Sequence, residues 1–124
     1  MKALLSIKPE FVSKIFTGEK VFEYRKAIFK RPKVKTVVIY STMPVGKIVG
    51  EFEIEEIIEL PPQELWNKTS KYSGISKEFF DSYFIERNTA FAIKIKDFVR
   101  YEEPVDPYLA YNNFKAPQSF KYID

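Results

Sequence analysis

The sequence predicts one α+β domain spanning residues 1–124, built on a small, mixed and barrel-like β-sheet. Runs of apolar, aromatic and β-branched residues indicate about six strands of uneven length, and apolar periodicity indicates about three helices. These strands do not alternate regularly with helices, so a Rossmann-type parallel sheet is not expected. The chain has no internal repeat, low-complexity tract or linker, and 124 residues suit a single domain.

The first third of the chain predicts a strand, a helix and a second strand. Residues 3–7 form a short apolar run, and Pro9 suits the first turn of a helix because its missing N–H would have no partner there. Gly18 is a predicted helix stop, since glycine readily adopts left-handed backbone angles. Residues 20–26 then have strand composition. The apolar face of the predicted helix comprises Phe11, Val12, Ile15 and Phe16.

The middle of the chain predicts two strands joined by a turn. Residues 34–42 form a continuous β-branched and aromatic run, which is typical of a buried strand. Residues 48–60 alternate apolar and acidic side chains, so most of the glutamates lie on a solvent-facing side. The alternation shifts at Glu55–Glu56, which predicts a β-bulge.

The remaining elements follow from caps, prolines and alternation. Ser76 is the predicted N-cap of a helix that runs to about Arg87. Residues 89–99 alternate as a strand with Phe91, Ile93 and Ile95 on one face, opposite Ala92, Lys94 and Lys96. The other predictions are a helix over 61–69, an irregular segment over 102–117 and a last strand over 118–123.

Two absences limit the chemistry that the chain can perform. Without cysteine there is no disulfide, thiolate nucleophile or cysteine metal ligand, and without histidine the commonest general base and zinc ligand is missing. Catalysis would have to come from Lys, Asp, Glu, Tyr, Ser, Thr or Arg. No acidic loop resembles an EF-hand, so we expect neither a metal site nor a cofactor.

Charge is distributed unevenly along the chain. Residues 1–35 carry ten Lys/Arg and three acids, whereas residues 48–64 carry six acids and no base. A basic region of this kind can meet phosphate, although blocks of like charge also arise by chance. No run approaches the roughly 18 apolar residues of a membrane helix, and the N-terminus lacks a signal peptide, so we expect a cytoplasmic protein that makes no membrane contact.

One cluster of charges follows the predicted helix stop. Lys20, Glu23 and Arg25 come after Gly18 with the spacing Gly-x-Lys-x-x-Glu-x-Arg. Residues two apart on a strand share a face, so Glu23 and Arg25 form a candidate pair that directs the guanidinium toward an anion. Lys20 joins them only if it still lies in the turn. The alternative is a solvated surface ion pair that contributes ~0–1 kcal/mol.

Polar residues near strand ends are further candidates for the same cleft. Each also has a plain structural interpretation as a turn cap or a solvated side chain. These candidate ligand-binding residues are Ser41, Thr42, Lys47, Gln118 and Ser119.

The motif and its surroundings resemble the ASCH family (activating-signal-cointegrator homology), a branch of the PUA-like superfamily. The resemblance rests on the Gly18 to Arg25 signature and on three flanking segments, residues 3–20, 37–54 and 116–120. It implies a compact PUA-like β-barrel in which one helix covers a cleft and two further helices are present. One bacterial branch removes an acyl group from acetylated cytidine with a lysine at the Lys20 position. That branch has threonine at the Glu23 position, so this chain departs from it.

The resemblance and the basic N-terminal third imply three functions of different classes. The first is an RNA- or nucleotide-binding domain that holds its ligand in the cleft. The second is a small hydrolase acting on an acylated nucleoside or on RNA, with Lys20 as nucleophile or base and Glu23 as acid/base or as a group that orients Lys20. The third is a coactivator-type protein-interaction module, for which the sequence offers no exposed apolar helix. Binding and catalysis both remain open at this point.

Overall fold

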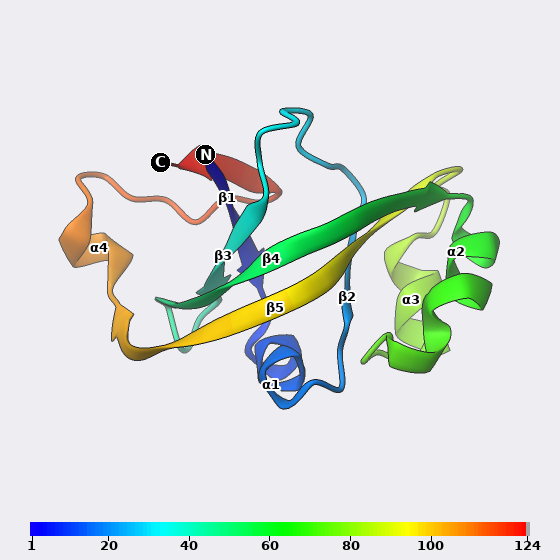
Figure 1. Ribbon diagram of the computed structural model, residues 1–124, viewed down its shortest axis with the longest axis horizontal. Coiled ribbons are helices and arrows are strands. Elements are labelled where there is room, and N and C mark those ends of the chain that lie inside the picture. Colours follow the sequence, from blue (N-terminus) through cyan, green and yellow to red (C-terminus); the bar gives the residue numbers. More distant parts are fainter. Residues whose placement is uncertain (124) are drawn as a thin grey trace.

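The computed structural model describes residues 1–123 and contains one six-stranded sheet with helices packed around it (Figure 1). The strands are β1 (Lys2–Ile7), β2 (Phe22–Arg25), β3 (Thr36–Ser41), β4 (Lys47–Leu60), β5 (Ala90–Val105) and β6 (Phe120–Ile123). The helices are α1 (Pro9–Thr17), α2 (Pro62–Thr69), α3 (Lys77–Tyr83) and α4 (Pro107–Ala110), with a 3₁₀ turn at Ser70–Tyr72. The α+β class and the six strands agree with the sequence-based prediction.

The strands follow the order β2-β5-β4-β3-β1-β6. Only the β1–β3 pair is parallel; the other pairings are antiparallel. Within residues 1–123, β2 and β6 lie at opposite ends of this order and do not pair with each other. The sheet is therefore mixed, as predicted, but its closure into a barrel is not confirmed.

The helix α1 connects β1 to the turn that precedes β2. Pro9 is its first residue, and Gly18 ends it with a left-handed φ of 84° while donating its N–H to Ile15 O. Both ends match the predicted start and stop, because proline needs no N–H partner in the first turn and glycine tolerates positive φ. The predicted strand over 20–26 is shorter in the structure, and the residues before Phe22 belong to the turn.

The strands β4 and β5 form a long antiparallel ribbon, seen as the two diagonal arrows in Figure 1. The predicted bulge at Glu55–Glu56 is confirmed by a register shift between Ile54 and Glu56. β5 continues to Val105, so the predicted irregular segment over 102–117 was wrong in its first part. Beyond Lys94 the strand has no β2 partner and forms an edge, where a proline such as Pro104 removes no ladder hydrogen bond.

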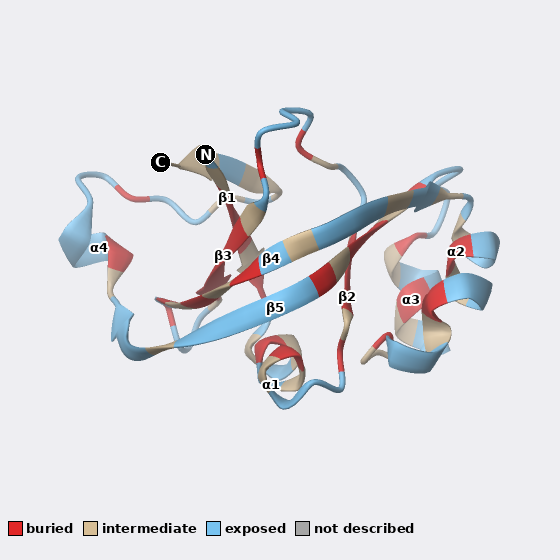
Figure 2. Cartoon of the chain, in the orientation of Figure 1, coloured by how far each residue is buried: buried red, intermediate tan, exposed pale blue. Residues whose placement is uncertain are grey.

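The core consists of separate clusters on the two sides of the sheet. One packs the apolar side of α1 against β1, β3 and the middle of the ribbon, and it includes Ile15 and Ile93. A second lies under α2 and α3 and includes Tyr24, Phe80 and Ala92. Ala92 lies on the face of β5 opposite Ile93, as predicted, and it is fully buried because α2 and α3 cover that side of the strand. Figure 2 shows that β1, β2 and β3 are largely buried, whereas much of β5 is exposed.

The helix α3 is shorter than predicted. Ser76 caps it as expected, with its hydroxyl accepting a hydrogen bond from Phe79 N, but the helix ends at Tyr83 and not near Arg87. The chain then turns, with Glu86 at a positive φ of 62°. The helix was predicted too long because the apolar spacing in the sequence continues past Tyr83. Phe84 is buried although it lies in the turn that follows the helix.

Candidate functional site

A cleft of about 270 Å³ lies where the end of β1, the start of α1, β2 and α3 meet. Its walls come from segments far apart in the chain, because the crossover through α1 brings β2 beside the loop before α3. Charged and aromatic side chains line it together. The lining residues are Ser6, Ile7, Lys8, Phe11, Lys20, Glu23, Tyr24, Arg25, Ile75, Phe79, Tyr83 and Gln118.

Lys20 lies in the turn before β2, so strand alternation does not force its side chain onto the face opposite Glu23. Its backbone N–H donates to Lys14 O, so the turn closes on the last residues of α1. The side chain is 1% exposed; its Nζ donates to Ser73 O at 2.8 Å and lies 4.0 Å from Glu23 Oε1. Burial lowers the pKa of Lys20 to about 8, against the opposing effect of Glu23 and with a smaller contribution from Lys14.

Two aromatic rings contact the Lys20 ammonium group. Its Nζ lies 4.9 Å from the centre of the Tyr24 ring and 5.3 Å from that of Phe11. The Tyr24 hydroxyl and the Thr69 hydroxyl are 2.7 Å apart, which fixes the ring at the end of α2. Burial raises the pKa of Tyr24 to about 12, so this phenol stays neutral near pH 7 and interacts with the ammonium through its π face.

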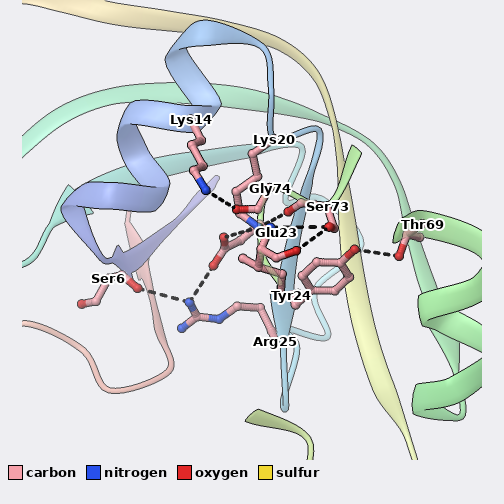
Figure 3. A network of polar contacts seen from close by, with 10 residues as sticks. Ser6, Lys14, Lys20, Glu23, Tyr24, Arg25, Thr69, Ser73 and Gly74 are labelled. Atoms are coloured by element: carbon pink, nitrogen blue, oxygen red, sulfur yellow. Dashed lines mark hydrogen bonds and ion pairs between the residues drawn. The ribbon is translucent and has the colours of Figure 1, made fainter. Parts of the chain in front are cut away.

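Glu23 and Arg25 form a nearly enclosed ion pair at the floor of the cleft (Figure 3). Glu23 Oε2 accepts a hydrogen bond of 3.1 Å from Arg25 Nη1, and the side chains are 6% and 11% exposed. Arg25 also donates from Nη1 to Ser6 O at 3.2 Å and from Nη2 to Ser119 O at 2.7 Å. The alternative of a solvated surface pair does not describe this arrangement, in which Arg25 joins β1, β2 and the approach to β6.

The loop between the 3₁₀ turn and α3 packs against Lys14 and Lys20. Lys14 Nζ donates to Gly74 O at 3.1 Å, beside the bond from Lys20 to Ser73 O (Figure 3). Gly74 has a positive φ of 69°, and a Cβ there would come within 2.5 Å of Lys20 Cβ. Sequence reasoning missed Lys14 and Gly74, because their roles depend on backbone carbonyls and close approach, which leave no residue-type signal.

The structure brings together five of the eight residues predicted for the cleft. Gln118 lines it beside the charged cluster of Lys20, Glu23 and Arg25, and Ser119 reaches that cluster through its carbonyl.

The other three predicted residues do not line this cleft. Ser41 lines a second hollow of about 380 Å³ that is bordered by other residues of α1. Lys47 is exposed opposite Ser41 at the start of β4, and Thr42 N donates to Ile7 O.

Residues 1–123 contain no group of three or more Asp or Glu side chains placed to hold a metal ion. None of the helices in this range is long and apolar enough to cross a membrane.

Comparison with protein families and known proteins supports one assignment. The family model for the ASCH domain matches residues 5–99. Over 91 residues the chain is 37% identical to large ribosomal subunit protein uL22 of Ureaplasma parvum serovar 3; this covers 73% of the chain but only 29% of that protein. Over 128 aligned positions it is 27% identical to an ASCH domain-containing ribonuclease of Zymomonas mobilis subsp. mobilis, covering 98% of the chain and 84% of the relative.

Among solved structures, the crystal structure of ASCH from Zymomonas mobilis superposes with a TM-score of 0.91 at 26% identity, covering 99% of this chain and 87% of that one. The similarity thus extends over the whole sheet and its helices, including the elements that form the cleft.

Proposed function

The chain belongs to the ASCH domain family, and we propose that it binds RNA, with one unpaired nucleotide held in the cleft around Lys20. Support for RNA as the ligand comes from the Zymomonas mobilis relative, which is named a ribonuclease and is similar over nearly the full length of this chain. The chain spans only about three tenths of the uL22 relatives, so their ribosomal role does not extend to it by similarity alone.

The observation that carries this proposal is the combination of cations and aromatic rings around one concave site. Lys8 and Lys20 lie among Phe11, Tyr24 and Tyr83 in a cleft of about 270 Å³. A nucleotide presents a flat π system and an anionic phosphate, which are the groups that aromatic and cationic side chains recognise. The residues proposed to bind it are Lys20, Glu23, Arg25, Gln118 and Ser119.

RNA binding can be measured by fluorescence anisotropy with an unstructured, labelled RNA oligomer. We expect binding at low salt that weakens steeply as salt is added, because phosphate contacts release counterions. Lys20→Ala is expected to reduce affinity about tenfold or more, since a charged hydrogen-bonding group is lost from the site. The matched control is Lys96→Ala, which removes an exposed lysine that lines neither hollow. Absence of binding by the wild-type protein at low salt would overturn the proposal.

A second candidate, cleavage of the bound RNA, is favoured by the lowered pKa of Lys20, about 8. A neutral amine there can take the proton of a ribose 2′-hydroxyl, whose oxygen then attacks the neighbouring phosphorus. The bond to the 5′ oxygen of the next nucleotide breaks, giving a 2′,3′-cyclic phosphate and a 5′-hydroxyl once that oxygen is protonated. Glu23, beside Lys20, would orient the amine or relay the proton.

Cleavage is expected to accelerate as pH rises toward 8, because the fraction of neutral Lys20 increases. RNA with 2′-O-methyl groups should bind but resist cleavage, and Lys20→Ala should abolish turnover while circular dichroism remains unchanged. Unaltered turnover in that variant would exclude Lys20 as the base. Release of an acyl group from an acylated nucleoside, with the RNA oligomer left intact, would assign the same residues to the other hydrolase reaction.

A further inference from the structure

Two exposed lysines lie over aromatic rings of α3 at the border of the cleft. Lys8 Nζ is 5.1 Å from the centre of the Phe79 ring, and Lys26 Nζ is 4.7 Å from that of Tyr83. Lys8 precedes α1 and Lys26 follows β2, so the two cations approach α3 from different elements. Both rings are partly buried and line the cleft.

The rings determine where these two ammonium groups lie. Within residues 1–123, neither Lys8 nor Lys26 forms an ion pair or a side-chain hydrogen bond, whereas Lys2, Lys77 and Lys94 each pair with a carboxylate. A cation held over a ring keeps its charge and its N–H donors toward solvent. Lys8 and Lys26 are therefore free to bind an anion at the cleft.

The two rings that hold these lysines follow one another along α3. Phe79 and Tyr83 are four residues apart, a rise of about 6 Å along the helix. Their ring planes are within 12° of parallel and their centres are 6.1 Å apart. Lys8 and Lys26 are thus held at successive positions along α3, where one strand that runs along the helix would meet both.

We propose that an unpaired RNA strand crosses the cleft along α3, with Lys8 and Lys26 holding the phosphates on either side of the nucleotide that enters it. This inference rests on the proposed RNA-binding function and specifies its substrate class. The cleft of about 270 Å³ has room for one nucleotide and not for a duplex. The domain then selects an internal nucleotide of single-stranded RNA over a free nucleotide or a chain end.

The first experiment compares small ligands that differ in phosphate number. A nucleoside 3′,5′-bisphosphate is expected to bind more tightly than either the 3′- or the 5′-monophosphate of the same nucleoside. Lys8→Ala should remove the advantage of one phosphate and Lys26→Ala that of the other, whereas Lys96→Ala should leave both. Equal affinity of the bisphosphate and a monophosphate for the wild-type protein would overturn the two-phosphate arrangement.

The second experiment measures the salt dependence of binding to an unstructured RNA oligomer. Each lysine substitution should lower the slope of log K against log salt by about 0.7, and the double variant by about twice that. A duplex of the same sequence should bind more weakly than the single strand.

An unchanged slope in the double variant, or equal binding of the duplex, would overturn the strand path while leaving RNA binding in place. If the wild-type protein fails to bind the oligomer at low salt, the proposed function itself is overturned.

Discussion

At Lys20, burial opposes the charge that an anion-binding cleft requires. The ammonium group is almost entirely removed from water, and the carboxylate of Glu23 at 4.0 Å offsets only part of the lost hydration, so the pKa falls to about 8. The hydrogen bond to Ser73 O and the rings of Phe11 and Tyr24 supply further interactions. Lys20 therefore changes from charged to neutral near pH 8, where its titration can be followed in the folded protein.

The pKa of Lys20 predicts how stability changes with pH. Between pH 8 and 10.5 the unfolded chain keeps a proton on this amine that the folded protein has released. Stability therefore rises with pH across this window, and the destabilising effect of burying the charge is complete below pH 8. Relative to Lys20→Met, the wild-type protein should gain on the order of 2 kcal/mol in unfolding free energy by pH 9.5.

This difference can be measured by denaturant titration of both proteins at several pH values. The difference in unfolding free energy between the two proteins cancels most of the contribution of the tyrosines, which begin to ionise in the unfolded state near the upper end of this pH range. Lys96→Met, an exposed control, should show the same pH profile as the wild-type protein. A constant difference between wild type and Lys20→Met would mean that Lys20 titrates normally.

Part of this residue-level arrangement was predictable from spacing. Strand alternation places Glu23 and Arg25 on one face, and the helix stop at Gly18 keeps Lys20 in the turn. The partners of these charges were not predictable, because Lys20 and Arg25 donate to the carbonyls of Ser73 and Ser119, which every residue type carries. Contacts to backbone depend on tertiary placement and not on sequence identity.

At the scale of elements, α1 lies close to the ribbon because Gly50 has no side chain. A Cβ at Gly50 would come within 2.4 Å of Val99 O and 2.7 Å of Phe16 Cζ. Gly50→Ala is therefore expected to destabilise the protein by roughly 1–3 kcal/mol, through displacement of α1 or separation of β4 from β5.

Gly18→Ala is the informative comparison for Gly50→Ala. A Cβ at Gly18 meets nothing within 4 Å, but the φ of 84° disfavours alanine by about 1–2 kcal/mol. The two variants thus separate backbone strain from steric overlap. Thermal unfolding together with the Trp66 fluorescence spectrum would measure both, and a Gly50→Ala protein as stable as the wild type would contradict the close packing of α1.

Element boundaries show which sequence signals are reliable. Pro9, Gly18 and Ser76 act locally on the backbone, and the structure places a helix start, a helix stop and a helix cap at these residues. The end of β5 was mispredicted because Pro104 is disfavoured only where a strand has a hydrogen-bonded neighbour on that side. The number of neighbours is a property of the sheet order, which local patterns do not contain.

At the scale of the whole molecule, the basic residues of the first third and the acidic run of residues 48–64 lie mostly in different parts of the fold. Five of the basic residues of the first third lie in, over or beside the cleft: Lys8, Lys14, Lys20, Arg25 and Lys26. The acidic run belongs largely to β4, where Glu55 pairs with Lys94 and Glu51 pairs with Lys2 and accepts a hydrogen bond from Tyr101. These basic residues thus gather around the cleft, whereas the acidic run follows β4, which lies between β3 and β5 in the sheet.

The cleft also lies between two hydrophobic clusters that pack separately. Ile7 and Phe11 on one wall belong with the cluster under α1, and Tyr24 and Tyr83 on the other belong with the cluster under α2 and α3. The long ribbon of β4 and β5 contributes residues to both clusters and so connects the two walls of the cleft. Because bending of the ribbon would move one wall relative to the other, we expect that a ligand touching both walls and the shape of the ribbon affect each other, and that this coupling is reciprocal.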